Sequence, residues 1–252
     1  MKILLSYLVT QNLASTFRRN QELQKRLHSI DHLESLIISD APSQAAVGFG
    51  ADAKGFKPSR FISSSHITDN DGEFAISVAR NIALDHAQNN NFDLLLLLDA
   101  DVVLLEDPVV PENAFTLTWT YFCDENESGR GAFALADPSK WRGGTGFVLK
   151  RECLGLRFFE GFKGYGYQDI DFQHNVLVPV VGEPSHWSTK SVHVWHQPRP
   201  PFPSSHWEAN KVLLIKRLVE TKGDGAFLEL EKWGTSEMVG MAKVYKYGNP
   251  QA

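Results

Sequence analysis

The feature that most constrains the fold is an apolar run that ends in two aspartates. Phe92 to Leu98 contains five consecutive leucines and a single polar residue, Asp93. A run that is apolar on both faces is typical of a central strand in a parallel sheet. Periodicity alone cannot distinguish such a strand from a buried helix, because leucine also favours helices. Asp99-Ala100-Asp101 follows directly and favours the strand, since open α/β sheets bind ligands at the carboxyl ends of their strands.

The rest of the first half supports an α/β fold. Strand-length apolar runs alternate with helix-length amphipathic stretches, which is typical of a mainly parallel central sheet flanked by helices. The pattern predicts strands over Lys2–Val9 and Leu36–Ser39, helices over Phe17–His28 and Glu73–Asn90, and a long surface loop over 41–60. In the second helix, Phe74, Val78, Ile82 and Ala83 fall roughly on one face. We expect that face to be buried.

Composition excludes several classes of protein. The chain has 252 residues, of which 42% are hydrophobic, so it can bury one core or two small ones and is not a disordered chain. The formal net charge is −5 and no long basic run occurs. We therefore expect no nucleic-acid partner, because binding a phosphate backbone requires clustered positive charge.

Cysteine usage and the N-terminus bear on location. Cys123 and Cys153 are the only cysteines, and their spacing suggests neither a zinc site nor a disulfide framework. The apolar stretch at Met1–Thr10 is too short for a signal sequence or a membrane span. We expect reduced thiols, no transmembrane segment and a cytoplasmic protein, with peripheral attachment to a membrane left open.

The two aspartates after the apolar run suit a metal ion. Asp99 and Asp101 offer hard oxygen ligands of the kind that Mn²⁺ or Mg²⁺ prefers. Such an ion can bridge the phosphates of a nucleotide and neutralise the charge on a leaving diphosphate. Asp-x-Asp alone is a weak signal, and its place after a predicted strand is what strengthens it.

Two segments carry a family resemblance. Ser77–Ala83, followed by Leu96–Asp101, resembles the first half of GT-A glycosyltransferases, where an Ala-Arg-Asn helix precedes an Asp-x-Asp strand. Gly161–Phe172 resembles the Gly-Trp-Gly-x-Glu-Asp-x-Asp segment of enzymes of the galactosyltransferase and N-acetylgalactosaminyltransferase type. These segments and their order cover roughly residues 1–200.

The resemblance implies a metal-dependent glycosyltransferase that moves a hexose from a nucleotide-diphosphate sugar, with a UDP-sugar favoured, to a carbohydrate or other hydroxyl acceptor. We expect a single GT-A catalytic domain over 1–252. Residues 1–105 would form its nucleotide-binding half, 106–205 its acceptor and catalytic half, and 206–252 a C-terminal helical extension. In that extension, Trp207–Val219 is amphipathic, which favours core packing over a binding surface.

The resemblance places the catalytic base at Asp169. Asp171 matches the later acidic position, while Gln168 stands where the family has Glu and is expected to meet acceptor hydroxyls. Chemistry supports the base independently, because a carboxylate can remove the proton of an attacking sugar hydroxyl. One base and direct displacement imply inversion. In the alternative interpretation, Asp169 only caps the helix that follows.

Other residues complete the expected site. The resemblance implies a metal ligand after the Asp169 segment, and His196 is the first choice and His193 the second, beside Asp101. Either histidine can instead be a partly buried side chain held by backbone. Gly143 and Gly144 are expected beside the donor sugar, although a plain turn would look the same. Further assignments are Gly166 near the acceptor, Asp40 at the nucleotide base with Arg80 nearby, and Arg199 in a proline-rich lid or linker.

Two other functions remain open. A nucleotidyltransferase would also use a metal-binding aspartate, but it would normally carry a glycine-rich loop with a basic residue after the first strand, and Gln11–Ala14 shows none. A non-catalytic protein that binds nucleotides or carbohydrates on the same fold is favoured by Gln168. Turnover of a donor distinguishes this protein from the enzyme.

Overall fold

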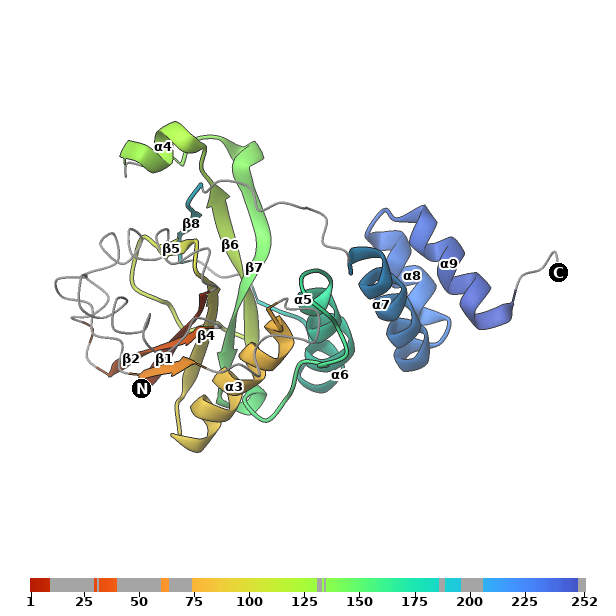
Figure 1. Ribbon diagram of the computed structural model, residues 1–252, viewed down its shortest axis with the longest axis horizontal. Coiled ribbons are helices and arrows are strands. Elements are labelled where there is room, and N and C mark those ends of the chain that lie inside the picture. The colour runs from red at the N-terminus through yellow and green to blue at the C-terminus, as the bar shows by residue number, and fades with distance from the viewer. Residues whose placement is uncertain are drawn as a thin grey trace.

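The computed structural model describes residues 1–9, 30, 32–39, 60–63, 74–130, 133, 135–185, 189–195 and 206–248. An eight-stranded sheet forms the centre of this part of the chain, with the order β3-β2-β1-β4-β7-β6-β8-β5 (Figure 1). The strands are β1 (Ile3–Val9), β2 (Leu33–Ser39), β3 (Arg60–Ser63), β4 (Leu94–Asp99), β5 (Val102–Leu104), β6 (Phe115–Phe122), β7 (Trp141–Lys150) and β8 (Ser191–His193).

The pairing of the strands confirms an α/β fold with a mainly parallel central sheet. Strands β3, β2, β1 and β4 are all parallel, and β6 is parallel to β8. The sheet becomes mixed beyond β4, because β7 runs antiparallel to both β4 and β6, and β5 runs antiparallel to β8. The apolar run at Leu94–Leu98 is a strand with every residue buried, as its two apolar faces predict.

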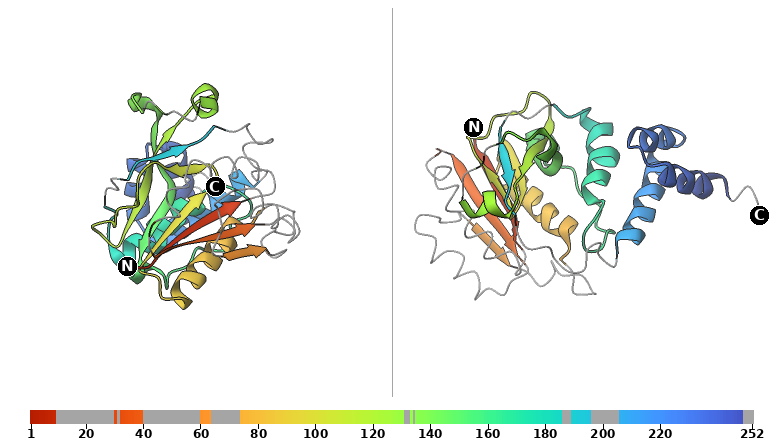
Figure 2. Two further views of the ribbon diagram at one scale, coloured as in Figure 1. Left: turned by 90° about the vertical axis from the view of Figure 1, so that its left-hand side faces the viewer. Right: turned by 90° about the horizontal axis from the view of Figure 1, so that it is seen from above.

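Most helices alternate with the strands along the chain, and α7, α8 and α9 follow the last strand. They are α3 (Ile76–Asn89), α4 (Glu125–Arg130), α5 (Gln168–Asp171), the π-helical η6 (Phe172–Leu177), α6 (Val178–Val181), α7 (Trp207–Lys222), α8 (Gly225–Lys232) and α9 (Ser236–Tyr247), with short 3-10 turns η4 (Pro138–Lys140) and η5 (Arg151–Cys153). Since α5, η6 and α6 follow one another without a break, 168–181 is one helical segment. Figure 2 shows α3 and this segment on the same side of the sheet.

Strand β2 and helix α3 begin at other residues than predicted. Strand β2 begins at Leu33 rather than Leu36, because Leu33, Glu34 and Ser35 pair with the start of β1. Helix α3 begins at Ile76 rather than Glu73. The predicted helix at Phe17–His28 and residues 41–59 of the loop predicted at 41–60 lie outside the described residues, while Arg60 is the first residue of β3 and not part of a loop.

Helix α3 buries part of its predicted apolar face together with two polar residues. Val78 and Ile82 are only half-buried, whereas Arg80 and Asn81 are almost fully buried. Asn81 donates to the carbonyl of Phe158 and accepts from its amide, at 2.9 and 2.8 Å. The predicted face is confirmed in part, since Ala83 is fully buried and Ile82 packs against the core. Both polar residues are buried as well because they find partners inside, which offsets the cost of burying them.

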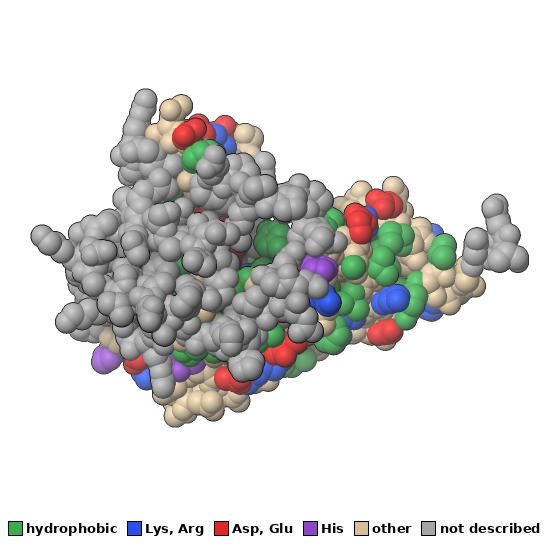
Figure 3. All heavy atoms as spheres, in the orientation of Figure 1, with side chains coloured by type: hydrophobic (Ala, Val, Ile, Leu, Met, Phe, Trp, Pro, Cys, Tyr) green, Lys and Arg blue, Asp and Glu red, His purple; other side chains and the backbone are tan. Residues whose placement is uncertain are grey.

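The last three helices form a unit with its own core (Figure 1). Leu214, Ile215, Leu218 and Val219 of α7 pack against residues of α8 and α9, which confirms most of the predicted core helix. Val212 was expected in that core but is 37% exposed. Figure 3 shows hydrophobic and charged side chains mixed over the surface of this unit.

Two further expectations concern cysteines and membranes. Cys123 and Cys153 are both buried and free. Within the described ranges, every helix is too short or too polar to cross a membrane.

Candidate active site

The Asp-x-Asp motif lies at the carboxyl edge of the parallel strands. The registers pair Val9 with Ser39 and Leu8 with Asp99, so β1, β2 and β4 all end at this edge. Asp99 closes β4 with its side chain 39% exposed, and Asp101 lies in the short turn before β5 with its side chain 9% exposed. Asp40 directly follows β2 in the sequence and lies outside the described residues.

One cluster at this edge joins Arg80, Asp99 and Asp169. Arg80 reaches across from α3, with an Nη2 atom 3.4 Å from Oδ1 of Asp99, and its Nη1 contacts Oδ1 of Asp169 at the start of α5. The arginine side chain is only 3% exposed, whereas that of Asp169 is 37% exposed. The guanidinium also lies 5.3 Å from the ring of Phe158 and 6.0 Å from that of Phe147.

Burial and the neighbouring carboxylate act on Arg80 in opposite directions. Removal from water lowers the pKa of its guanidinium, and the charge of Asp99 raises it again. Arginine stays protonated at neutral pH even when buried. The site therefore holds a fixed positive charge between two carboxylates that remain open to solvent. The structure brings together three residues that the sequence predicts.

A second pair lies beside this cluster. Strand β8 pairs with β5 so that His193 lies opposite Val102, and its Nε2 is 3.4 Å from Oδ2 of Asp101. The imidazole stacks on Phe122, with ring centroids 4.3 Å apart and an 11° angle between the planes. Facing carboxylate and imidazole groups are a suitable donor set for Mn²⁺.

The predicted metal set is only partly within the described residues. Asp101 and His193 converge, but His196 lies outside them, as does Arg199. Across the ranges that the structure does describe, no group of three or more His, Cys, Asp and Glu side chains is arranged to hold a metal ion. The third ligand therefore stays a prediction.

The glycine segment before Asp169 forms a tight loop. Gly166 has a φ of +119°, and a Cβ there would lie 2.6 Å from the ring of Trp207, so only glycine fits. Tyr167 follows with a φ of 70° and is the N-cap of α5. Asp169 therefore lies within the first turn and is not the cap, and its carboxylate contacts Arg80.

Gln168 and Asp171 are both engaged with the protein itself. Gln168 is buried, accepts from the amide of Gly166 at 2.8 Å and donates to the carbonyl of Gly164 at 2.7 Å. Asp171 is buried and accepts from Asn175 at 2.8 Å and Arg217 at 2.7 Å. Their expected contacts with sugar hydroxyls stay predictions, but both side chains already hold the loop and α5 in place.

Gly143 and Gly144 lie near the start of β7, as expected. Gly143 pairs with Trp119 of β6, next to a shift of register after Leu117. A sugar contact at these glycines stays a prediction.

A cavity of about 440 Å³ opens next to Asp169. Its walls come from β6, β7, the glycine loop, the 168–181 helical segment and the first turn of α7, and are lined by Leu117, Phe147, Tyr165, Gly166, Tyr167, Gln168, Asp169, Ile170, Gln173 and Trp207. Apolar and aromatic walls with a few polar groups are typical of ligand sites. Sequence reasoning missed Trp207 as a lining residue, because its pattern indicated only a packed helix.

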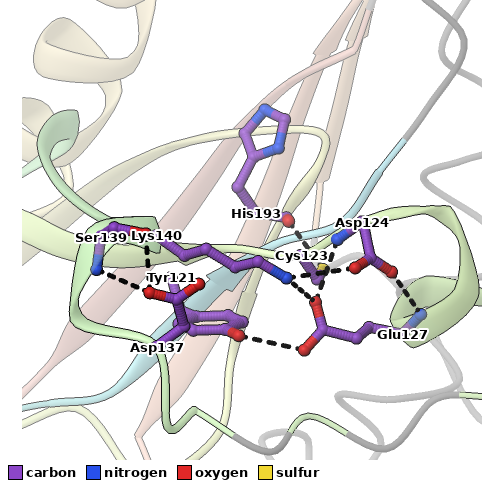
Figure 4. A network of polar contacts seen from close by, with 8 residues as sticks. All are labelled: Tyr121, Cys123, Asp124, Glu127, Asp137, Ser139, Lys140 and His193. Carbon is purple, nitrogen blue, oxygen red and sulfur yellow. Dashed lines mark hydrogen bonds and ion pairs between the residues drawn. The ribbon is translucent and has the colours of Figure 1, made fainter.

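A second polar network lies beside β8 (Figure 4). Lys140 contacts Glu127 at 2.8 Å and Asp124 at 3.1 Å, and the hydroxyl of Tyr121 donates to Glu127 at 3.0 Å. Cys123 donates through Sγ to the carbonyl of His193 at 2.9 Å. These contacts hold the connection between β6 and β7 in place beside β8, the strand that contains His193.

Comparisons with known proteins add little beyond this geometry. No protein-family model and no curated protein matches the chain. It is similar to the mannosyltransferase PcManGT from Pyrobaculum calidifontis in complex with GDP-Man and Mn²⁺, with 15% identity and a TM-score of 0.47 over 98% of this chain and 70% of that one. It is also similar to S. aureus TarS 1-349 in complex with UDP, with 12% identity and a TM-score of 0.46 over 98% of this chain and 72% of that one. Likeness at this level carries no functional argument, so function has to be inferred from the residues of the site.

Proposed function

We propose that the chain is a metal-dependent, inverting glycosyltransferase that moves a hexose from a nucleotide-diphosphate sugar, with a UDP-sugar favoured, to a carbohydrate or other hydroxyl acceptor. The observation that carries this proposal is the meeting of Arg80, Asp99 and Asp169 at the carboxyl edge of the sheet, beside a cavity of about 440 Å³. Three separate elements supply these residues, and ligands bind to α/β sheets at this edge.

The donor would lie along this edge. Asp101 and His193, with His196 as the proposed third ligand, would hold Mn²⁺ or Mg²⁺. The bound ion would neutralise charge on the departing diphosphate. Asp40 is proposed for the nucleotide base, and Gly143 with Gly144 for the donor sugar.

Asp169 is placed to act on the acceptor. Its Oδ1 is buried against Arg80, while the rest of the half-exposed carboxyl group borders the cavity. A hydroxyl in the cavity would give its proton to this carboxylate as its oxygen bonds to the anomeric carbon. The bond from that carbon to the diphosphate breaks, and the electron pair leaves with the nucleoside diphosphate. A single displacement of this kind inverts the anomeric centre.

The buried arginine fixes the geometry of this step. Arg80 cannot move far, because it is enclosed by Phe147 and Phe158 and bound to both carboxylates. Its rigid fork of donors suits that role better than a lysine would. Residues 1–105 would form the nucleotide-binding half of one domain, and 106–205 its acceptor and catalytic half.

A panel of sugar nucleotides tests the proposal. Thermal unfolding is measured with Mn²⁺ and each UDP-sugar in turn, and with GDP-Man, and release of nucleoside diphosphate is then followed with a panel of glycoside acceptors. We expect one donor to raise the melting temperature only with metal and to be turned over. Binding without turnover favours the non-catalytic binding protein. Formation of pyrophosphate from a nucleoside triphosphate and a sugar phosphate favours the nucleotidyltransferase, and binding of no donor contradicts the proposal.

A further inference from the structure

Helix α7 binds the glycine loop through a buried carboxamide. Asn210 is 2% exposed. Its Nδ2 donates to the carbonyl of Lys163 at 2.7 Å and to that of Gly166 at 3.3 Å, and its Oδ1 accepts from the amide of Lys163 at 3.2 Å. One side chain therefore satisfies backbone groups at both ends of the loop, from a helix more than 40 residues further along the chain.

Trp207 holds the same peptide from another side. It lies one turn before Asn210, and its ring occupies the space where a Cβ of Gly166 would be. It also packs on Tyr167, with centroids 4.7 Å apart. Gly166 is thus fixed by three side chains, since its amide also donates to Gln168 at 2.8 Å.

The same helix also contacts α5 beyond Asp169. Two turns after Asn210, Arg217 donates through Nε to Oδ1 of Asp171 at 2.7 Å, and its guanidinium lies 3.9 Å from the ring of Phe159. Helix α7 therefore contacts the chain both before and after Asp169. Other residues of α7, among them Leu218, lie in the core of the C-terminal unit, to which Phe162 before the glycine loop also contributes.

We propose that Asn210 is a positioning residue for Asp169, which makes the C-terminal helical unit a working part of the site. The inference rests on the proposed function, since it takes Asp169 as the base. Helix α5 begins two residues after Gly166, so the loop that Asn210 fixes decides where the Asp169 carboxylate lies relative to Arg80 and the cavity. A displacement of about 1 Å at a reacting group can cost on the order of 10²-fold in rate.

The test compares Asn210→Ala with Leu218→Ala. Both change α7, but Leu218 is fully buried in the core of the helical unit, and its truncation should lower the melting temperature through a cavity. Hydrogen exchange of amides 163–171 and kinetics of sugar transfer are measured below both melting temperatures. For Asn210→Ala we expect exchange in the loop to rise by about tenfold or more. We also expect kcat to fall by about tenfold or more, with the donor KM within about twofold of wild type.

The control should behave in the opposite way. Leu218→Ala should leave loop exchange and kcat close to wild type despite its lower melting temperature. If Asn210→Ala fails to fold, Asn210→Ser, whose side chain is too short to span the loop, is measured in its place. Unchanged loop exchange, or equal effects of both substitutions on kcat, overturns the positioning role. If the wild-type chain turns over no donor, the proposed function fails with the catalytic part of this inference, while hydrogen exchange still decides whether Asn210 fixes the loop.

Discussion

Two clusters in this molecule each join one cation to two carboxylates, and they are built in different ways. Around Arg80, the carboxylates of Asp99 and Asp169 come from a strand and a helix far apart in the sequence, and the cation is 3% exposed. Around Lys140, the partners Asp124 and Glu127 lie within 16 residues of it, and the cation is 28% exposed (Figure 4).

This difference in burial indicates which of the two clusters is suited to take part in a reaction. In the Lys140 cluster the contacts raise the pKa of the lysine and lower those of Asp124 and Glu127, so all three groups are charged at neutral pH and bind one another. Partly exposed ion pairs of this kind contribute about 0–1 kcal/mol. In the Arg80 cluster the cation is buried and immobile, while its carboxylates stay half-exposed and one borders the cavity. A site needs this combination of a fixed charge and accessible partners.

The strongest test of this contrast is Asp169→Asn. The amide keeps the shape and can still contact its neighbours, but it cannot accept a proton. We expect sugar transfer to fall by about 10²–10⁴-fold, with donor and Mn²⁺ affinity nearly unchanged. Single-turnover kinetics and calorimetry together measure both effects. Transfer at the wild-type rate would leave Asp169 as a structural partner of Arg80, like the carboxylates around Lys140.

The next prediction concerns Asp101 and His193, which we propose as metal ligands. Chain order favours His196 over His193 as a proposed ligand, and the 3.4 Å contact between Asp101 and His193 supports His193 as a second candidate. We expect Asp101→Asn to weaken Mn²⁺ binding by about 10–100-fold, and His193→Ala to weaken it by less. His174→Ala is the matched control, because His174 faces Glu229 in the C-terminal part. Unaltered Mn²⁺ titration of Asp101→Asn would remove the assignment.

Gln168→Glu tests the loop itself. The carboxylate could still accept from the amide of Gly166, but it would face the carbonyl of Gly164 with no proton to donate. We expect a loss of about 1–3 kcal/mol in the free energy of unfolding and a modest fall in transfer. Burial against a carbonyl should raise the pKa of this carboxyl group above its ordinary value of about 4.3, so the difference in stability from wild type should narrow as pH falls toward that value and be smallest below it. Denaturant unfolding at several pH values measures this, and equal stability at neutral pH would show that Gln168 does not hold the loop.

Lys140→Met should have the smallest effect. Losing an exposed ion-pair cluster should lower the free energy of unfolding by about 1 kcal/mol or less, and transfer should stay at the wild-type rate. The same denaturant and kinetic measurements apply. A large loss of activity would mean that this network supports His193 and that the two clusters are not separate in function.

The sequence predicts the parts of the site that leave a local pattern. The leucine run is apolar on both faces, so β4 and the position of Asp99 at its end follow directly from it. Arg80 was expected near the nucleotide through resemblance, but the apolar spacing of α3 did not predict that its side chain is buried. The spacing of apolar residues along α3 does not show that Asp99 and Asp169 lie at the edge of the sheet and pair with the buried arginine.

Contacts between distant residues could not be predicted. The hydrogen bonds from Asn210 to Lys163 and Gly166 join residues that lie more than 40 positions apart in the sequence. No pattern in the sequence indicates that these residues are partners. The sequence pattern indicated only that Trp207 is the first residue of an amphipathic helix. Its position in the cavity wall depends on how α7 packs against the rest of the protein. Gln168 was interpreted as a contact for the acceptor because it stands where the resembled family has Glu. The sequence does not show that its carboxamide binds the backbone of the glycine loop.

We propose that the carboxyl edge of the parallel strands binds a nucleotide diphosphate through a divalent metal ion. Isothermal titration of UDP, and of GDP in parallel, into the wild-type chain with Mn²⁺ and then with a chelator tests it most directly, with Asp101→Asn as the site control. We expect one nucleotide to bind with Mn²⁺ and to lose about tenfold or more in affinity both with the chelator and in the variant. Equal affinity with and without metal, or no binding of either nucleotide, would contradict the account.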